Sequence, residues 1–476
     1  MSKCVYVQRS LAVAAATLVL SSCASVPRVD EEQLLAVGAD THSIEVYDAR
    51  GPLTPRQSKA VLDRVARQAP DAGALERHLA VEQQVAEHPL YAGNSVRILQ
   101  DGEQTFPAIF EAIRAARHYV LLEYYIFEDV QCEGQSLKDL LAGKSRDGVH
   151  IYVIYDGVGS LDSPSQFFDA LRAAGVQFVE FNPPNPLKAK GHYSPNSRDH
   201  RKLLVVDGER AIVGGVNLSS TYETSPTGSS AGSSGSSSNE KAAPAEQQVW
   251  HDTDMEIQGP IVHELARLFV GHWNGQQGPP LDPEVGSEKP AAAGTEVARL
   301  IGSNPSKLKT RYYITVLSAV RTAESSIWIT AAYFVPTHQE LEDLVGAAGR
   351  GVDVRLLLPA HSDSTMALDV QRSYYGELIK SGVKVYELRD GVLHSKTIVI
   401  DGVWSIVGSS NLDQRSVLFN DEVDVVVLGK STGKALTDEF SRNLGRSEQI
   451  DLAHWKARPL SEKVRARVWR LWEEFL

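Results

Sequence analysis

One short stretch of sequence occurs twice in this chain. The first copy reads His200-Arg201-Lys202-Leu203-Leu204-Val205-Val206-Asp207-Gly208, and the second reads His394-Ser395-Lys396-Thr397-Ile398-Val399-Ile400-Asp401-Gly402. Both follow the pattern H-x-K-x-x-x-x-D, and they lie 194 residues apart. The agreement continues downstream, with Gly214-Gly215-Val216-Asn217-Leu218-Ser219 against Gly408-Ser409-Ser410-Asn411-Leu412-Asp413. A single H-x-K is common by chance, but two copies with matched flanks indicate a duplicated domain.

Other segments repeat in the same order. The run from Gly148 to Val153 matches Gly351 to Leu356 at an offset of 203 residues, and Gly175 to Phe178 matches Gly382 to Val385 at 207. A period near 200 residues indicates domain duplication, because solenoid repeats are about 20–50 residues long. From Asn94 onward, short β-rich runs alternate with amphipathic helical stretches. This alternation predicts an α/β fold with two similar halves, each a mixed sheet flanked by helices.

Composition shifts suggest where the halves begin and end. We expect a signal peptide over residues 1–22, a tether and accessory helical region over 23–92, and the first half over 93–275. A linker rich in Gly, Pro and Ala then covers 276–294, and the second half covers 295–476. Residues 224–245 are rich in Ser and Gly with few apolar side chains, which predicts a flexible insertion inside the first half.

The repeated motif has a direct chemical interpretation. His and Lys lie two residues apart at the start of a strand-like run, so they point to the same face. An imidazole can act as nucleophile or as acid and base, whereas an ammonium suits the non-bridging oxygens of a phosphodiester. Asn217 and Asn411 can add neutral donors for a charged phosphorane. The alternative, a solvated edge strand, would not explain two matched copies.

The repeat also places one carboxylate at an equivalent position in each half. Asp252 lies seven residues before Gly259, and Glu422 lies seven residues before Gly429. A carboxylate at this place could accept the second imidazole N–H and support the imidazolium. From the sequence alone, Asp254 or Asp424 could be the inward-facing residue instead. Asp207 and Asp401 stand five residues beyond each Lys, on the opposite strand face, so we expect them to stabilise the fold.

The amino terminus has the features of an export signal. Lys3 and Arg9 precede the apolar run from Leu11 to Leu20, and ten apolar residues make only about 15 Å of helix, too short to span a bilayer. Leu20-Ser21-Ser22-Cys23 resembles a bacterial lipobox, which implies cleavage before Cys23 and its acylation. Ala24 in place of Asp favours the outer membrane, facing the periplasm, if the host is Gram-negative. The alternative is an ordinary signal peptide with an incidental Cys23.

Charge and cysteine content exclude several classes of protein. The 476 residues carry 48 Lys and Arg against 60 Asp and Glu, a net charge of −12, which disfavours nucleic acid as a partner. The three cysteines, Cys4, Cys23 and Cys132, lack the spacing of a disulfide scaffold or a zinc site. Cys132 is typical of a buried small hydrophobe.

The chain from about Asn94 onward resembles the phospholipase D superfamily, specifically its bacterial cardiolipin synthase branch. The resemblance rests on both H-x-K motifs with their Asp-Gly ends and Asn flanks, and on three further stretches: Tyr333-Phe334-Val335-Pro336, Arg350-Gly351-Val352-Asp353-Val354-Arg355, and Asn420-Asp421-Glu422. It implies that both halves meet at a pseudo-two-fold interface and bring their His and Lys into one pocket. Neither a cofactor nor a metal is implied.

The resemblance also assigns roles to the motif residues. His200 is the expected nucleophile that forms a phosphohistidine, and His394 the acid and base, although near symmetry leaves the reverse open. Phosphoryl oxygens would be held by Lys202, Lys396, Asn217 and Asn411. The imidazoles would be oriented by Asp252 and Glu422.

The favoured hypothesis is a membrane-tethered phosphatidyltransferase that joins two phosphatidylglycerols to give cardiolipin and glycerol. Hydrolysis of phospholipid to phosphatidate is the first alternative, because the same residues serve both reactions. The third hypothesis is a nuclease or phosphodiesterase of the same superfamily. The fourth is a non-enzymatic binding protein. The sequence does not indicate an oligomeric state.

A carboxy-terminal helix is expected from apolar residues at helical spacing, with Arg465, Arg467 and Arg470 between them: Val464, Val468, Leu471, Trp472 and Phe475. We favour core packing of this helix over a position in a lipid interface.

Overall fold

The computed structural model describes residues 44–86, 88–190, 193–223, 249–304 and 311–470, together with 26, 28 and 29. The expected signal peptide, the lipobox Cys23 and the Ser/Gly insertion at 224–245 lie outside these residues. Within the described part of the chain, no helix is long and apolar enough to span a bilayer.

The first half is a mixed sheet with helices on its outer face. Its strands lie in the order β8-β7-β4-β9-β10-β12-β3, with β4, β7 and β8 parallel to one another. The elements are β3 (Leu90–Gln100), α5 (Asp101–Ala115), β4 (Tyr119–Tyr124), β5 (Gln131–Cys132), β6 (Gln135–Ser136), α6 (Leu137–Arg146), β7 (His150–Asp156), α7 (Ser165–Ala173), β8 (Gln177–Phe181), β9 (Lys202–Val206), β10 (Arg210–Gly214), β11 (Trp250–His251), β12 (Thr253–Gln258) and α8 (Val262–Gly275).

The second half repeats this topology. Its strand order is β16-β15-β14-β18-β19-β20-β13, and antiparallel pairing of β13 with β3 joins the two halves. The elements are β13 (Glu296–Ser303), α9 (Arg311–Thr322), β14 (Ser326–Thr330), α10 (His338–Gly349), β15 (Asp353–Pro359), α11 (Thr365–Lys380), β16 (Lys384–Leu388), β17 (Val392–Leu393), β18 (Thr397–Ile400), β19 (Trp404–Gly408), α12 (Gln414–Leu418), β20 (Glu422–Leu428) and α13 (Lys430–Leu444). The predicted duplicated α/β fold is confirmed.

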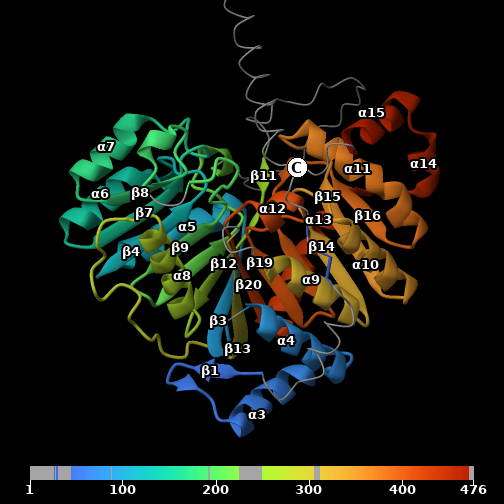
Figure 1. Ribbon diagram of the computed structural model, residues 1–476, viewed down its shortest axis with the longest axis horizontal. Helices are drawn as coiled ribbons and strands as arrows, with labels where there is room; N and C mark the ends of the chain where they lie inside the picture. Colours follow the sequence, from blue (N-terminus) through green and yellow to red (C-terminus); the bar gives the residue numbers. More distant parts are fainter. Residues whose placement is uncertain are drawn as a thin grey trace, which may run out of the picture.

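The two sheets face each other across an apolar core. β10 packs against β19 and β20, and β12 packs against β19, so equivalent strands of the two halves make reciprocal contacts. Apolar side chains of both sheets fill the space between them, Leu203 and Val205 from one and Val425 and Val427 from the other. Helices α5, α6 and α7 cover the outer face of the first sheet, and α9, α10 and α11 cover that of the second (Figure 1). The carboxyl ends of the central strands of both halves therefore meet near the middle of the molecule.

The accessory region forms a cap on the second half. It consists of β1 (Val46–Asp48), β2 (Gly51–Pro52), α3 (Pro55–Ala66) and α4 (Ala72–Ala86). α4 packs against α9, and its buried Glu82 accepts hydrogen bonds from Arg299 at 2.9 Å and from the Trp404 indole at 3.0 Å. The expected start of the first half at residue 93 falls inside β3, which begins at Leu90. The expected linker, in contrast, matches the segment between α8 and β13, which contains no helix or strand.

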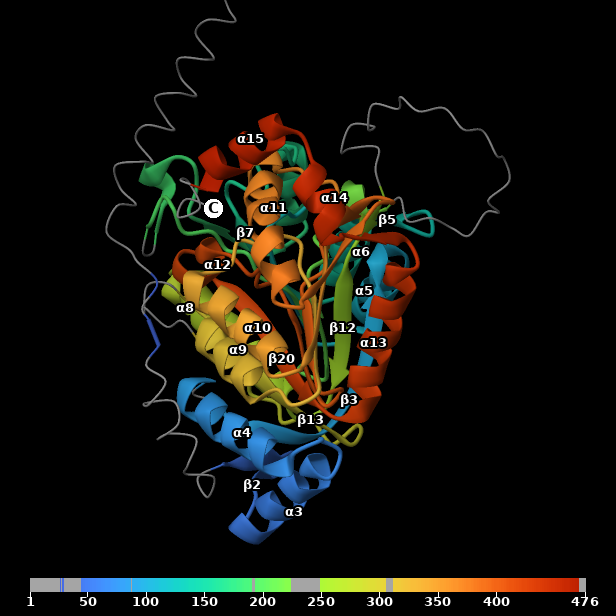
Figure 2. The same cartoon turned by 90° about the vertical axis from the view of Figure 1, so that its right-hand side faces the viewer.

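The described chain ends in β21 (Ser447–Gln449), α14 (Leu452–Ala457) and α15 (Leu460–Arg470). α15 packs on α11 and lies at the end of the molecule opposite α3 (Figures 1 and 2). The expected core packing is wrong for Val464 and Val468, which are 51% and 48% exposed. Helical spacing groups these residues on one face, but that face points to solvent while Ala466 is buried on the other. Leu471, Trp472 and Phe475 lie outside the described residues.

Candidate active site

The backbone brings each motif histidine to the other half of the molecule. The His200 N–H donates to the carbonyl of Asp421 at 2.9 Å, and the His394 N–H donates to the carbonyl of His251 at 2.7 Å. The first contact lies beside an isolated parallel β-bridge between Asp199 and Asp421. The second lies beside the parallel strand pair β11–β17. In each case the acceptor immediately precedes a carboxylate of the motif, so the pairing of histidine and carboxylate crosses between the halves.

The side chains follow this crossed arrangement. His200 Nδ1 lies 3.0 and 3.1 Å from the two carboxylate oxygens of Glu422. His394 Nδ1 lies 2.7 Å from Asp252 Oδ2. Because the carboxylates occupy both Nδ1 atoms, each imidazole keeps its Nε2 for other partners.

A pocket of about 460 Å³ opens where the two halves meet, and both histidines line it. The two predicted asparagines also line the pocket, and so do aromatic side chains from both halves. The side chains that line it are Tyr125, Ile126, Val158, Arg198, His200, Asn217, Thr221, Tyr222, Trp250, Tyr333, Val335, Asp363, Ser364, Ala367, His394, Asn411, Asp413, Arg415 and Asn420. The structure thus places His200, His394, Asn217 and Asn411 around one space.

The two asparagines have different surroundings. Asn217 Oδ1 accepts the N–H of Ile126 at 3.2 Å, and the Asn217 side chain also forms a hydrogen bond with Tyr222. The Oδ1 of Asn411 is buried and has no hydrogen-bond partner among the described residues. Buried amides usually satisfy their polar atoms, so this oxygen is available to a hydrogen-bond donor of a ligand, such as a hydroxyl, whereas contact with a phosphoryl oxygen would come from the amide nitrogen.

The two lysines lie behind the histidines and do not line the pocket. The Lys202 side chain donates to the carbonyl of His200 at 2.6 Å, and Lys396 Nζ contacts both the carbonyl of His394 and its Nδ1. Both ammonium groups are buried. Contact with a phosphoryl oxygen would require each lysine to exchange its backbone carbonyl for the ligand.

Burial controls the charge of this cluster. It lowers the pKa of His200 to about 4, although Glu422 opposes the change, and it lowers the pKa of Lys202 to about 7. The pKa values of His394 and Lys396 are lowered for the same reason, with Lys396 adding to the effect on His394. Burial disfavours the charged form of Glu422 as well, but the adjacent His200 keeps the pKa of that carboxyl below its ordinary value. The site therefore holds a neutral imidazole at His200 above pH 4.

Asp254 and Asp424, the alternatives left open by the sequence, face the asparagine loops instead of the imidazoles. Asp254 Oδ1 accepts the N–H of Val216 at 3.0 Å, and Asp424 Oδ1 accepts the N–H of Ser410 at 3.2 Å. A side chain at Gly214 would put its Cβ 2.2 Å from Asp254 Oδ1, and one at Gly408 would lie 2.1 Å from Asp424 Oδ1. The matched glycines thus allow these carboxylates to hold the loops that carry Asn217 and Asn411.

The motif aspartates Asp207 and Asp401 lie outside the pocket. Asp207 accepts the N–H groups of residues 117, 118 and 119, each at 2.8 Å. Asp401 accepts those of residues 324, 325 and 326 at 2.7–3.0 Å. Each aspartate therefore anchors the start of a central strand, β4 or β14.

Several residues that support the histidines were not identified from the sequence. Glu422 accepts hydrogen bonds from Ser409 at 2.5 Å, Ser416 at 3.0 Å and Asn420 at 3.2 Å. In the other half, the Tyr222 hydroxyl lies 2.9 Å from His394 Nδ1. The offset of 194 residues pairs Ser416 with Tyr222 and Ser409 with Gly215, so the repeat itself points to these positions.

Two arginines in the pocket wall were also missed. Arg198 bonds Asp156 at 3.2 Å, and Arg415 donates to the carbonyl of Asn196 at 3.1 Å. Both line the pocket with the histidines. They supply positive charge at the surface of the cavity, where the lysines do not reach.

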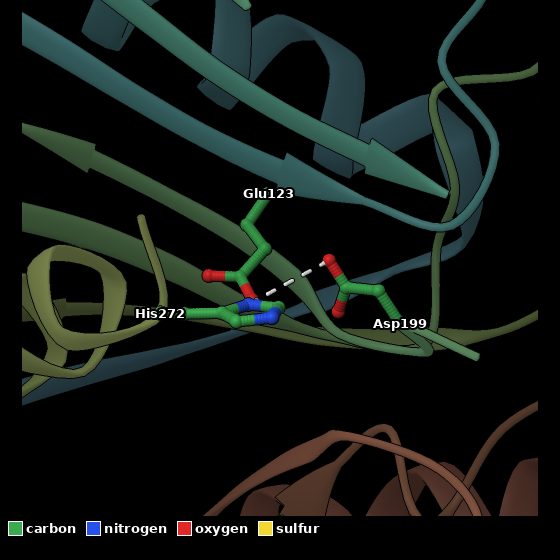
Figure 3. Close-up of side chains that lie close together, drawn as sticks. All are labelled: Glu123, Asp199 and His272. Atoms are coloured by element: carbon green, nitrogen blue, oxygen red, sulfur yellow. Dashed lines mark hydrogen bonds and ion pairs between the residues drawn. The ribbon is translucent and has the colours of Figure 1, made fainter. Parts of the chain in front are cut away.

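A buried ionic network lies next to His200. Arg201 donates to Glu123 at 3.0 Å, to Asp421 at 3.4 Å and to the carbonyl of Glu422 at 3.2 Å, which ties the halves together. His272 Nδ1 lies 2.7 Å from Glu123 Oε1 and 3.9 Å from Asp199 Oδ2 (Figure 3).

This network is also a candidate metal site. Within the described residues, Glu123, Asp199 and His272 form the one group whose ligand atoms lie close enough to share a metal ion. The guanidinium of Arg201 already supplies positive charge to Glu123, so we interpret the group as an ionic network.

Comparison with known proteins identifies the family. A family model described as "Cardiolipin synthase, PLD-like domain" matches residues 109–225 and 316–444. The chain is 34% identical over 401 residues to the cardiolipin synthase of Geobacillus thermodenitrificans, covering 83% of this chain and 74% of that protein. It is 32% identical over 389 residues to that of Alkalihalophilus pseudofirmus, covering 80% and 72%. The chain belongs to the phospholipase D superfamily, in its cardiolipin synthase branch.

Solved structures support the fold assignment. A phosphatidylserine synthase of Haemophilus influenzae superposes with a TM-score of 0.60 at 12% identity, covering 83% of this chain and 99% of that one. At this identity the likeness shows a common fold and carries no argument about activity. The predicted family, fold and enzyme class are confirmed: the chain is a cardiolipin synthase-like enzyme of the phospholipase D type.

Proposed function

We propose that this enzyme transfers a phosphatidyl group from one phosphatidylglycerol to another, producing cardiolipin and glycerol through a phosphohistidine. The observation that carries the proposal is the crossed arrangement of two histidines in one pocket. Each Nδ1 faces a carboxylate, at 3.0 Å for His200 and 2.7 Å for His394, so both Nε2 atoms are available to the substrate. A nucleophile and an acid–base partner are thereby present in the same cavity.

The first step breaks the bond between phosphorus and the headgroup glycerol. His200 Nε2 attacks phosphorus, and His394 in its protonated form donates a proton to the departing glycerol oxygen. Burial lowers the pKa of His394, so this form is the minor one in the free enzyme, and the bound anionic phosphodiester favours it. The pKa of His200 near 4 keeps this imidazole neutral at physiological pH, as a nucleophile requires. The product is phosphatidyl-His200, with Glu422 stabilising the positive charge that develops on the ring.

The second step reverses the first with a different alcohol. His394, now neutral, removes the proton from a headgroup hydroxyl of a second phosphatidylglycerol. The resulting oxygen attacks phosphorus and the P–N bond to His200 breaks, which regenerates the free enzyme and gives cardiolipin. The amide nitrogens of Asn217 and Asn411 stabilise the phosphorane oxygens in both steps, joined by Lys202 and Lys396 once each lysine exchanges its backbone carbonyl for the ligand. Arg198 and Arg415 line the same pocket.

The proposal is tested by the products formed from phosphatidylglycerol vesicles. Purified enzyme is expected to yield cardiolipin and glycerol in equal amounts, as resolved by mass spectrometry. Phosphatidate as the sole lipid product would contradict transfer and favour hydrolysis. The His200→Ala and His394→Ala variants are expected to be inactive, and substantial turnover by either would contradict the two-histidine mechanism.

We further propose that the mature protein is an exported lipoprotein, anchored through acylated Cys23 and, in a Gram-negative host, held at the periplasmic face of the outer membrane. Support comes from the lipobox-like sequence before Cys23 and from Ala24 after it. Several acyl chains make a stable anchor, whereas one gives only marginal binding.

Fractionation of cells that express the Cys23→Ser variant tests the anchor. The variant is expected to lose stable membrane association, while Cys132→Ser should behave as the unmodified protein. The membranes are washed at high salt, which weakens electrostatic docking through other surfaces. Unchanged retention of Cys23→Ser after this wash would contradict lipidation at that residue.

A further inference from the structure

The described part of the chain exposes a small set of large apolar side chains on three segments, one of which also contributes to the pocket wall. Val158 and Leu161 follow the carboxyl end of β7, and Leu187 stands in the short 3-10 helix after β8. The others lie on α15. The full set is Val158 (40% exposed), Leu161 (60%), Leu187 (93%), Leu460 (75%), Val464 (51%) and Val468 (48%). We call these six residues the apolar rim.

The apolar rim is connected to the pocket on two sides. Val158 belongs both to the rim and to the pocket wall. Opposite it, Ala367 of α11 lines the pocket, and α11 is the helix on which α15 packs. An ion pair of 2.7 Å between Arg465 and Asp369 holds α15 to α11. The apolar rim therefore flanks the entrance through which a substrate reaches the histidines.

α15 presents its apolar stripe to solvent. Leu460, Val464 and Val468 follow one another at intervals of four residues and so lie on one side of the helix. The buried Ala466 lies on the other side. A globular helix normally turns its apolar stripe toward the core, so the reversed orientation indicates a partner outside the described fold.

The segments that carry the apolar rim are together net positive, opposite in sign to the whole protein, although Asp162 is exposed beside Leu161. Residues 452–470 contain six Lys and Arg against one Glu, whereas the complete chain carries a net charge of −12. Leu187 is followed by Lys188 and Lys190, both exposed. Apolar side chains interleaved with basic ones are the pattern of a surface that rests on anionic lipid headgroups.

We propose that the apolar rim is a membrane-docking surface, which seats the pocket entrance on an anionic phospholipid bilayer independently of the Cys23 anchor. The substrate assumed here is the phospholipid of the proposed function. A protein bound to the same surface would cover the pocket entrance, whereas a bilayer both contacts the rim and supplies the substrate. The rim side chains enter the headgroup region, and the basic residues between them contact lipid phosphates.

Hydrogen–deuterium exchange of the unmodified full chain tests the docking directly. Phosphatidylglycerol vesicles are expected to slow exchange in α15 and in the loops after β7 and β8, while α3 at the far end remains unchanged. Vesicles of phosphatidylcholine should protect these segments much less. Equal protection by both lipids, or protection of α3 without α15, would overturn the proposal.

A charge-introducing variant separates docking from catalysis. The double variant Val464→Glu with Val468→Glu is expected to lose about tenfold in turnover of phosphatidylglycerol vesicles at limiting lipid. Its turnover of a short-chain, monomeric phosphatidylglycerol should remain that of the unmodified enzyme. The matched control, Arg56→Gln with Ala60→Glu on α3, changes the charge equally at exposed positions and should leave both rates unchanged.

The outcomes distinguish this proposal from the proposed function. Normal vesicle turnover by the double variant would overturn docking but leave phosphatidyl transfer standing. A parallel loss on vesicles and on monomeric lipid would assign α15 a role in folding or catalysis and would also overturn docking. If the unmodified enzyme forms no cardiolipin from either substrate, the proposed function fails, and the exchange experiment still decides the docking.

Discussion

His200 of the first half lies 3.0 Å from the carboxylate of Glu422 in the second half, 222 residues further along the chain. The reciprocal pair, His394 and Asp252, is separated by 2.7 Å. Neither half therefore contains a complete histidine–carboxylate pair of its own. The active site exists only where the two halves meet, and its chemistry depends on their docking.

Glu422→Gln is the sharpest single test of this crossed pairing. The variant keeps the shape of the side chain but removes the negative charge that supports the His200 imidazolium. We expect kcat to fall by about 10²–10⁴-fold, the usual worth of such a group. Steady-state turnover of phosphatidylglycerol measures the effect.

Asp424→Asn is the matched control for that substitution. Burial raises the pKa of Asp424 to about 7, and its carboxyl faces the loop of Asn411 instead of an imidazole. An amide therefore replaces a group that is partly neutral already, and kcat should change by less than about tenfold. Equal losses in Glu422→Gln and Asp424→Asn would contradict a special role for Glu422.

The pH dependence of kcat/KM should show a limb that belongs to Lys202. This lysine has a pKa of about 7, so it loses its positive charge as the pH rises through that value. With the charge it loses the ability to stabilise phosphoryl oxygens, so kcat/KM should decline above pH 7. This decline adds to the one caused by deprotonation of His394, the acid of the first step, whose pKa burial lowers from its ordinary value. The neutral form of His200, whose pKa is about 4, sets the acid limb. A bound anionic phosphodiester favours the ammonium, so the alkaline limb of kcat should lie at higher pH.

Lys202→Arg identifies the group responsible for the alkaline limb. A guanidinium stays charged throughout the range, so the variant should be slower overall but should lose the limb near pH 7. The profiles from pH 4 to 10 of the two enzymes decide the point. If the alkaline limb is unchanged in Lys202→Arg, a residue other than Lys202 is responsible for that limb.

The motif aspartates should contribute to stability and not to chemistry. Asp401 accepts three backbone N–H groups and has a φ of 54°, a conformation that alanine adopts with strain. Asp401→Ala is expected to lower the free energy of unfolding by about 2–4 kcal/mol, measured by urea denaturation. Asp401→Asn keeps one acceptor and tolerates this φ, so its loss should be smaller. A large drop in kcat with unchanged stability would contradict the structural role.

The sequence was sufficient to predict the fold, and it selected the two histidines, two asparagines and two carboxylates that the structure brings together. Two copies of H-x-K with matched glycines and asparagines indicated the duplication, and the α/β alternation indicated the class of fold. The repeat also located Asp252 and Glu422, although it could not exclude Asp254 and Asp424. That choice depends on the close packing of Gly214 and Gly408 against the two aspartates, which becomes visible only in three dimensions.

Other features depend on docking and could not be read from local patterns. The crossing of Glu422 to His200 results from a backbone hydrogen bond between the halves, and no sequence period encodes it. Lys202 and Lys396 share a strand face with the histidines, yet they lie behind them because their side chains bond the histidine carbonyls. For α15, helical spacing predicted an apolar stripe but not which way it faces.

The most direct test of the account is to identify the covalent intermediate. The enzyme is mixed with phosphatidylglycerol, quenched within one turnover under alkaline conditions, digested and analysed by mass spectrometry. The two-histidine mechanism predicts a phosphatidyl group on the peptide that contains His200. This adduct should accumulate in His394→Ala when the substrate has a leaving group that needs no proton. A label on His394 alone would reverse the two roles, and the absence of any labelled histidine would contradict the two-histidine site.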